Sequence, residues 1–320
     1  MQQAAQETAA EQKVSVNPEF VKKLEEIVGR EQISLQEPMS KHTTFRAGGE
    51  CDYFVSPSEI SQIKEIINLC HKEQLPYYII GNGSNLLVSD NGYRGVMIHL
   101  GPSFAGCEVD EEAGIVTVKA GAALGGLVRM VSRRGLGDMT WAAGIPGSFG
   151  GAVVMNAGAY GGELKQVLME VTWLEEDGSL VTAPASELGL GYRQSIFKHS
   201  RKIVLEGKLK LEKADPEKLM ARIEALNQTR REKQPLEYPS AGSTFKRPEG
   251  YFAGKLIEDS GLRGYRLGGA QVSEKHCGFV INRDNATASD LYKLFQHIKA
   301  VVRENFQVEM ELEVELIGEF

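Results

Sequence analysis

Three uncharged, glycine-rich segments mark places where the backbone itself could bind a ligand. They read GNGSN at 81–85, GIPGSFGG at 144–151 and VVMNAGAYGG at 153–162. Glycine permits positive φ angles and lets the main chain approach a ligand closely. Successive backbone N–H groups in such a turn form an anion-binding concavity suited to a pyrophosphate. The same pattern also fits a plain turn and tight strand packing, so both interpretations stay open.

The uncharged run from Met139 to Gly162 could span a membrane, fill a core or line a ligand site. Its seven glycines and one proline make it a poor helix, and the GxxxG at 147–151 has meaning only within a good apolar helix. We therefore exclude a membrane span. The GNGSN turn lacks the GKS or GKT of a Walker A motif and precedes a strand rather than a helix. These features disfavour a Rossmann site and favour another kind of dinucleotide cradle.

The composition is that of an ordinary globular protein with room for about two or three domains. The chain has 320 residues, 25% of them charged, and a formal net charge of -7, which argues against a general nucleic-acid binder. Four cysteines and six histidines are scattered without metal-ligand spacing, so we expect free thiols and no metal. Residues 1–15 are polar and lack the apolar core of a signal peptide, which predicts a disordered tail on a cytoplasmic protein.

Hydrophobic periodicity predicts the elements that must position these loops. Helical spacing predicts helices at 16–30, from Pro57 to Cys70, and at 124–135, 215–233, 250–261 and from Thr287 onward. Strands are predicted at 42–55 (with a glycine turn), 77–80, 86–89, 115–119, 203–211, 279–282 and 308–318, with a hairpin at 167–183 around Asp177-Gly178.

The predicted strand at 308–318 places four glutamates, at 309, 311, 313 and 315, on one face. A solvated strand edge that carries charge against aggregation explains such a face, and we prefer this explanation for Glu309 and Glu311. If the face is partly buried, repulsion from Glu311 and Glu315 should raise the pKa of Glu313.

Seven segments together resemble one enzyme family. In order they are HTTFRAGG (42–49), GNGSNLLVSD (81–90), GIPGSFGGAVVMNAGAYGGE (144–163), GYRQSIF (191–197), SAGSTFKRP (240–248), SEKHCGFVIN (273–282) and VELIG (314–318). They resemble the UDP-N-acetylenolpyruvoylglucosamine reductases, which complete UDP-N-acetylmuramate for bacterial cell-wall synthesis. The resemblance runs from about residue 17 to residue 320.

The resemblance implies an α+β fold, with a two-part FAD-binding module of the vanillyl-alcohol oxidase/PCMH type and a C-terminal α+β substrate-binding domain. We accordingly expect FAD-binding subdomain 1 at 16–100, with the strand at 308–320 returning to it. Subdomain 2 should occupy 101–213, and the substrate-binding domain 214–307. We also expect a monomer with no membrane or nucleic-acid partner.

The resemblance assigns FAD to the glycine-rich loops, where a neutral wall avoids burying unpaired charge beside the isoalloxazine ring. Arg46 is either a phosphate or flavin contact or an ordinary surface arginine. The expected FAD-binding residues are Arg46, Gly81, Asn82, Gly83, Ser84, Asn85, Leu86, Gly144, Ile145, Pro146, Gly147, Ser148, Gly150, Gly151 and Asn156.

The implied reaction is the reduction of UDP-N-acetylglucosamine enolpyruvate. NADPH reduces FAD, and flavin N5 then gives a hydride to the enolpyruvyl methylene carbon, so that negative charge develops towards the carboxylate. By the resemblance, Arg193 stabilises that charge, Ser243 donates the proton and Glu313 assists. A fixed guanidinium fork suits a carboxylate. From spacing alone, Ser243 would be an ordinary loop serine.

Lys233, Lys246 and Arg247 are expected to bind the substrate's phosphates or carboxylate. Two positions depart from the family pattern, which often has asparagine at 247 and a basic residue at 315, and this puts phosphate contacts near the C-terminus in doubt. The short connection from Arg193 to Ile203 indicates the shorter second type of this enzyme, with an open cleft.

Two alternatives remain. The first is a different flavin oxidoreductase, such as an oxidase that shares only the FAD half. The second is a catalytically inactive relative that binds a UDP-sugar or nucleotide without turnover.

Overall fold

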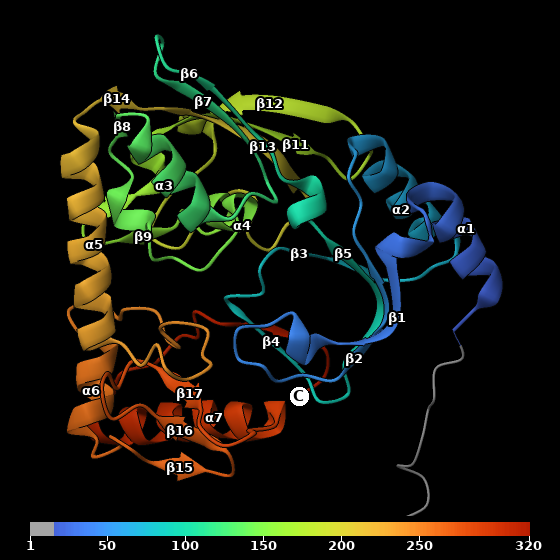
Figure 1. Ribbon diagram of the computed structural model, residues 1–320. Coiled ribbons are helices and arrows are strands. Elements are labelled where there is room, and N and C mark those ends of the chain that lie inside the picture. The colour runs from blue at the N-terminus through green and yellow to red at the C-terminus, as the bar shows by residue number, and fades with distance from the viewer. Residues whose placement is uncertain (1–15) are drawn as a thin grey trace, which may run out of the picture.

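The computed structural model describes residues 16–320, so the predicted tail at 1–15 lies outside the described residues. Figure 1 shows three units: a sheet with two helices on the right, a second sheet above, and a helical unit below. The long helix α5 (Pro216–Lys233) runs along one side, from the second unit to the third. No helix in the described part of the chain is long and apolar enough to cross a bilayer.

The first unit is a four-stranded sheet in the order β1-β2-β5-β3, with helices α1 and α2 against it. β1 is antiparallel to β2, whereas β5 is parallel to both β2 and β3. Phe20 and Leu24 of α1 and Ile63 and Ile66 of α2 are buried in the shared core, as their helical spacing predicted. The elements are α1 (Pro18–Val28), β1 (Ile33–Pro38), β2 (Glu50–Val55), α2 (Ile60–Lys72), β3 (Tyr77–Ile80) and β5 (Tyr93–His99).

Two predictions for this unit are wrong. Residues 42–49 form turns rather than a strand, because Arg46 and Gly48 have φ angles of 53° and 121°, which break an extended chain. Helix α2 begins at Ile60 rather than at Pro57. Glu59 caps it, forming a capping box with the Gln62 side chain.

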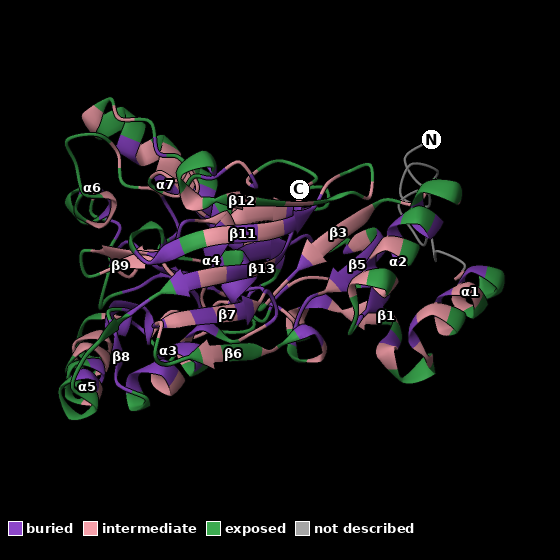
Figure 2. Ribbon diagram, turned by 90° about the horizontal axis from the view of Figure 1, so that it is seen from above, coloured by how far each residue is buried: buried purple, intermediate pink, exposed green. Residues whose placement is uncertain are grey.

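The second unit is an antiparallel sheet in the order β12-β11-β13-β7-β6. Figure 2 shows these strands side by side, with the central β13 largely buried and the edge strand β6 largely exposed. The uncharged run lies against this sheet, and its Phe149 and Val153 are fully buried. The elements are β6 (Cys107–Asp110), β7 (Ile115–Lys119), α3 (Leu124–Arg133), β8 (Leu136–Gly137), α4 (Phe149–Val154), β9 (Gly158–Ala159), β10 (Gly162–Glu163), β11 (Leu168–Leu174), β12 (Leu180–Pro184), β13 (Ile203–Lys210) and β14 (Glu212–Lys213).

The third unit has a core of its own, built around helix α7. Thr287 caps α7 and forms a capping box with Asp290. The unit is joined to the first by Asp90, whose carboxylate oxygens accept hydrogen bonds from the backbone N–H groups of Ala288 and Ser289 at 2.7 and 2.8 Å. Its remaining elements are α6 (Ala253–Asp259), β15 (Arg266–Leu267), β16 (Ala270–Val272), β17 (Val280–Asn282) and α7 (Ala288–Phe306).

The C-terminal segment returns to the first unit, where β18 (Glu315–Ile317) pairs in parallel with β4 (Leu86–Val88). The continuous strand predicted at 308–318 is otherwise wrong, because β4 is only three residues long and offers no longer partner. Residues 308–314 lie outside any strand, with bends at 313–314, and Leu312 forms an isolated bridge with Phe245. Met310 and Val314 are nevertheless buried, so the alternation correctly identified which side chains point inward.

Candidate active site

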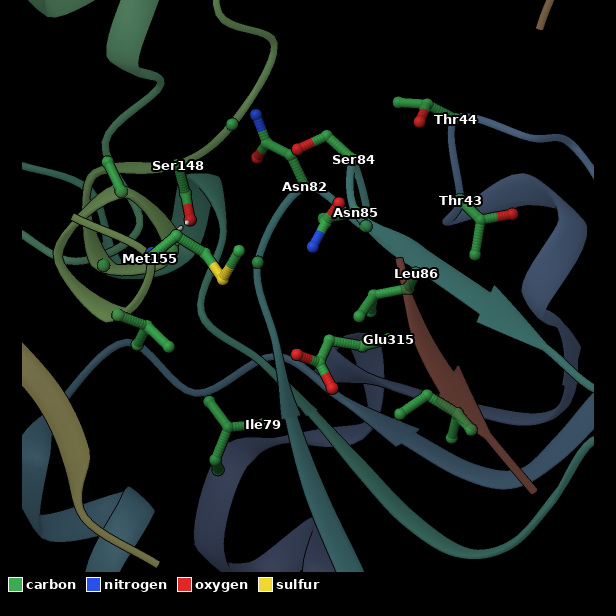
Figure 3. A pocket seen from close by; sticks show the side chains of 18 of the residues that line it. Thr43, Thr44, Ile79, Asn82, Ser84, Asn85, Leu86, Ser148, Met155 and Glu315 are labelled. Atoms are coloured by element: carbon green, nitrogen blue, oxygen red, sulfur yellow. Dashed lines mark hydrogen bonds between the residues drawn. The ribbon is translucent and has the colours of Figure 1, made fainter. Parts of the chain in front are cut away.

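A cleft of about 1620 Å³ lies between the three units. Its volume exceeds the several hundred Å³ typical of sites for one drug-sized ligand, so a dinucleotide and a second substrate have room together. All three units contribute to its lining. Figure 3 shows part of it, with Asn82, Ser84, Ser148 and Met155 around the upper edge and Glu315 pointing into the open space.

The turn at 81–86 forms one wall of the cleft. A Cβ atom at Gly83, whose φ is +58°, would lie 1.9 Å from the backbone oxygen of His42, and one at Gly81 would lie 2.2 Å from Ser148 Oγ. Position 83 therefore requires glycine, and a side chain at position 81 would displace the Ser148 hydroxyl. Asn82 Nδ2 donates to the backbone oxygen of Pro146 at 3.1 Å, which ties this turn to the 144–151 loop. The two glycine-rich segments form one continuous surface.

This wall fits a cofactor such as FAD, because backbone N–H groups of a glycine-rich turn can bind a pyrophosphate and an uncharged surface suits a neutral ring system. Thr44 Oγ1 lines the cleft and is buried without a hydrogen-bond partner among residues 16–320. A buried hydroxyl normally has a partner, and a ligand in the cleft would supply one. Gly150 supports the packing interpretation instead, because a Cβ there would lie 2.8 Å from Ala120 Cβ. The uncharged run therefore serves both the core and the cleft.

Arg193, Ser243 and Glu313 come from distant parts of the sequence and all line this cleft. Arg193 Nε donates to Glu313 Oε1 at 2.5 Å. The side chain of Arg193 is 21% exposed and that of Glu313 is 12% exposed. The backbone N–H of Glu313 donates to the oxygen of Thr244 at 2.9 Å, so the Ser243 loop lies beside Glu313. The three predicted catalytic side chains are thus brought together.

The glutamates at 311, 313 and 315 face three cations rather than one another. Lys246 pairs with Glu311, Arg193 with Glu313, and Lys198 with Glu315 at 3.1 Å. We call this series the ion-pair ladder. Lys246 lowers the pKa of Glu311 through its hydrogen bond and charge. The expectation for Glu313 assumed that these carboxylates repel one another. That assumption is wrong, because each carboxylate has its own counter-ion.

Most of the predicted FAD-binding residues line the cleft. They are Arg46, Gly81, Asn82, Gly83, Ser84, Asn85, Leu86, Ile145, Pro146, Gly147, Ser148, Gly150 and Gly151. Gly144 and Asn156 do not. Asn156 is 1% exposed, and its side chain donates to Glu163 and to the backbone oxygen of Gly191 and accepts from Lys165 N–H. Its contacts hold the turn that carries Arg193.

The three predicted substrate-binding cations also lie outside the cleft lining. Lys233 is exposed at the end of α5, and Lys246 belongs to the ion-pair ladder. The guanidinium of Arg247 stacks over the Phe252 ring at 3.8 Å. These cations lie on or close to segments that line the cleft, so they can meet only a ligand that extends beyond it.

The cleft residues that sequence reasoning missed include Lys198, Arg230 and Gln234. Arg230 and Gln234 are four residues apart at the end of α5, a spacing that puts both on one face. That spacing was the available signal, but without the fold nothing indicated that this face meets the cleft. Among residues 16–320, no group of histidine, cysteine and carboxylate side chains could hold a metal ion.

Two family models match the chain. An FAD binding domain matches residues 51–184, and the UDP-N-acetylenolpyruvoylglucosamine reductase C-terminal domain matches residues 234–317. A Phl p 4 variant described as a glucose oxidase shares the fold, with a TM-score of 0.51 and 16% identity over 62% of this chain and 44% of that one. Fold and cleft define a flavoprotein oxidoreductase with a PCMH-type FAD-binding module and an added C-terminal α+β domain, which confirms the predicted fold class.

Longer matches identify the family. A UDP-N-acetylenolpyruvoylglucosamine reductase of Lachnoclostridium phytofermentans is 48% identical over 306 residues, which cover 95% of this chain and 99% of that protein. One of Agathobacter rectalis is 47% identical over 315 residues, 95% and 100% of the two chains. The crystal structure of the Thermus caldophilus enzyme matches with a TM-score of 0.75 and 34% identity, over 89% of this chain and 98% of that one. The chain belongs to the UDP-N-acetylenolpyruvoylglucosamine reductase family, an FAD-dependent family of reductases.

Proposed function

We propose that this chain uses NADPH to reduce UDP-N-acetylglucosamine enolpyruvate to UDP-N-acetylmuramate for peptidoglycan synthesis. The observation that carries the proposal is that Arg193, Ser243 and Glu313 line the same cleft as the 81–86 turn, whose Asn85 Nδ2 donates to the backbone oxygen of Glu313 at 2.8 Å. When bound, FAD supplies hydride-transfer chemistry between NADPH and the enolpyruvyl methylene carbon. The 81–86 turn would hold its pyrophosphate, and the 144–151 loop and Thr44 would contact the rest of it.

Arg193 would bind the substrate carboxylate and stabilise the negative charge that develops next to it. Glu313 holds Nε of the guanidinium, and the backbone oxygen of Gly158 accepts from Nη2 at 3.3 Å. These contacts fix the orientation of the fork before substrate arrives and leave Nη1 for the carboxylate. A donor that is already aimed at the developing charge needs no reorganisation during the reaction.

Ser243 would donate a proton to the carbon next to the carboxylate. A serine hydroxyl is a weak acid, so it must face a strongly basic carbon or be assisted by neighbours. The ion pair between Arg193 and Glu313 lines the same cleft, next to the 243–244 loop, and would supply such assistance. Lys233, Lys246 and Arg247 would meet the diphosphate outside the reaction centre. The short connection from Arg193 to β13 supports the shorter second type of the enzyme, and we propose that it works as a cytoplasmic monomer.

The test is an anaerobic titration of the purified protein. We expect visible flavin absorbance that NADPH bleaches and that returns only when UDP-N-acetylglucosamine enolpyruvate is added. Fast reoxidation by oxygen alone would instead indicate an oxidase. Flavin reduction without any effect of the sugar nucleotide would contradict the proposed substrate. Binding of the sugar nucleotide by a protein without flavin would indicate an inactive binding protein.

A further inference from the structure

Seven lysine and arginine side chains line the cleft within residues 16–320, and five of them form ion pairs. The five pairs are Lys41 with Glu37, Arg193 with Glu313, Lys198 with Glu315, Arg201 with Glu176 and Lys202 with Glu175. Arg46 and Arg230 have no carboxylate partner in the described part of the chain. Arg46 is exposed, so water can solvate its charge, whereas Arg230 is only partly accessible.

Arg230 is therefore a partly desolvated cation that faces a cavity. Burial lowers the pKa of its guanidinium, and nearby Tyr160 offsets this only in part. Arginine is rarely buried unless it is paired, because removing a charge from water is costly without a compensating interaction. The protein holds this charge at the cleft wall without a partner of its own, and a ligand that enters the cleft can supply one.

Gly144 creates the space that Arg230 occupies. A Cβ atom at this position would lie 2.6 Å from Arg230 Cδ and 2.8 Å from Nη1. The guanidinium is thus packed directly against the backbone of the glycine-rich loop that forms the cleft wall. This contact explains why Gly144 lies outside the cleft lining although its neighbours Ile145 and Pro146 belong to it.

Gln234 adds an acceptor beside this donor. Its backbone N–H donates to the oxygen of Arg230 at 2.8 Å, which places it one turn further along. Its side-chain Oε1 is buried without a hydrogen-bond partner among residues 16–320, and the residue lines the cleft. An unpartnered buried acceptor is costly. The end of α5 therefore offers an unpartnered donor fork and an unpartnered acceptor four residues apart.

We propose that Arg230 and Gln234 bind the edge of a cyclic imide, in which a carbonyl oxygen lies beside an N–H group. The carbonyl accepts from Arg230, and the N–H donates to Gln234 Oε1. The pyrimidine ring of a flavin and the uracil of the sugar nucleotide both carry such an edge. We assign the site to the flavin because Arg230 packs on the 144–151 loop, which forms one wall with the 81–86 turn. This assignment rests on the proposed function.

The positive charge of Arg230 has a consequence for the cofactor. Reduction places negative charge on the pyrimidine side of a flavin, and a cation there tunes its electronics. Arg230 should therefore bind the reduced cofactor more tightly than the oxidised one. Arg230→Met should weaken FAD binding and lower the preference for reduced FAD about tenfold, which corresponds to a fall of about 30 mV in the two-electron midpoint potential.

The experiment compares Arg230→Met with Arg231→Met, measuring the dissociation constant of FAD and the flavin midpoint potential. Arg231 is the neighbouring exposed residue, already paired with Glu224 and Gln228, so its loss should change neither quantity. Gly144→Ala keeps the charge but displaces the guanidinium, and should shift both quantities in the same direction as Arg230→Met. Gln234→Leu should weaken FAD binding. The preference of the protein for reduced over oxidised FAD should change by less than about threefold, so the midpoint potential should change little.

Titration of each holoenzyme with UDP distinguishes the two sources of the imide. An increase of about tenfold in the UDP dissociation constant, with FAD binding and potential unchanged, would assign the site to uracil and overturn the flavin assignment. If Arg230→Met changes none of the three quantities, the proposal as a whole is wrong. Should Arg230→Met fail to fold, Arg230→Lys takes its place, because it keeps the charge and loses the fork; it should weaken FAD binding and preserve the potential. These readouts need no turnover, so they are independent of the test of the proposed reaction.

Discussion

Arg193 and Glu313 are 120 residues apart in the sequence and form an ion pair of 2.5 Å in the cleft. Arg193 has a φ of +53°, an uncommon conformation that costs roughly 1–3 kcal/mol for a non-glycine residue. Its turn is held by the bridge between Gly191 and Gln194 and by Asn156, which donates to the oxygen of Gly191 at 2.9 Å. The protein thus keeps a strained turn in order to aim one guanidinium at the cleft.

Glu313→Gln should slow substrate reduction without affecting the reduction of the flavin. The neutral amide no longer fixes the charged fork, so stabilisation of the developing charge falls. We expect kcat/KM for the sugar nucleotide to decrease about 100-fold, while stopped-flow bleaching of the flavin by NADPH changes little. Glu309→Gln is the matched control, because Glu309 is exposed and pairs only with Arg303. Equal loss in both half-reactions would mean that Glu313 acts on the flavin or on the fold.

Ser243→Ala should abolish most product formation and leave flavin reduction by NADPH intact. If the hydroxyl delivers the proton, its removal costs about 100- to 10,000-fold in turnover. Ser289→Ala, at the exposed start of α7, serves as the control. Rapid-quench analysis of the sugar product reports the step directly. Loss of NADPH-dependent bleaching in Ser243→Ala would assign the serine a structural role instead.

Asn156→Ala should weaken catalysis indirectly, through the Arg193 turn. Its side chain makes three hydrogen bonds in a nearly inaccessible position, and each partner left unsatisfied costs roughly 1–3 kcal/mol. We expect a lower Tm and a higher KM for the sugar nucleotide, with FAD affinity retained. Asn68→Ala, on the exposed face of α2, should change none of these. A variant that loses FAD and keeps its Tm would restore the original prediction that Asn156 binds the cofactor.

The sequence was informative where chemistry or periodicity left a local pattern. The glycine-rich segments located the cleft wall, and apolar spacing located α1, α7 and strands β3, β7 and β13 within a few residues, but it did not indicate β1 or β5. The role of Asn156 could not be predicted, because the sequence of a glycine-rich loop does not show whether its asparagine side chain contacts a ligand or the protein backbone. Only the fold gives the Arg193 turn as its neighbour.

The ion-pair ladder illustrates a second limit. Four alternating glutamates indicated a charged strand face, but the cations that neutralise Glu311, Glu313 and Glu315 come from two other segments. Their pairing depends on how three units meet, which no spacing encodes. Arg230 is similar, since helix α5 is polar around most of its surface and buries only Leu219 and Ile223. Its cleft-facing side is therefore invisible in the pattern of apolar residues.

His99 predicts a pH dependence of stability that can be isolated from the rest of the protein. Burial, with a smaller contribution from the nearby charge of His42, lowers the pKa of His99 from 6.5 to about 4. Between these two values the unfolded chain binds the proton and the folded chain does not, so the free energy of unfolding falls as the pH falls from 6.5 towards 4. The full shift corresponds to about 3 kcal/mol, and partial solvent exposure reduces this to roughly 1–2 kcal/mol.

His99→Gln should remove this component. The measurement is urea unfolding at several pH values for the wild type, His99→Gln and the control His71→Gln, which replaces an exposed imidazole on α2. We expect the wild type to lose roughly 1–2 kcal/mol more than His99→Gln between pH 7 and pH 4, and His71→Gln to follow the wild type. Parallel curves for wild type and His99→Gln would show that folding leaves the proton affinity of His99 unchanged. The acid sensitivity would then belong to the carboxylates of the ion pairs, which lose their partners when they are protonated.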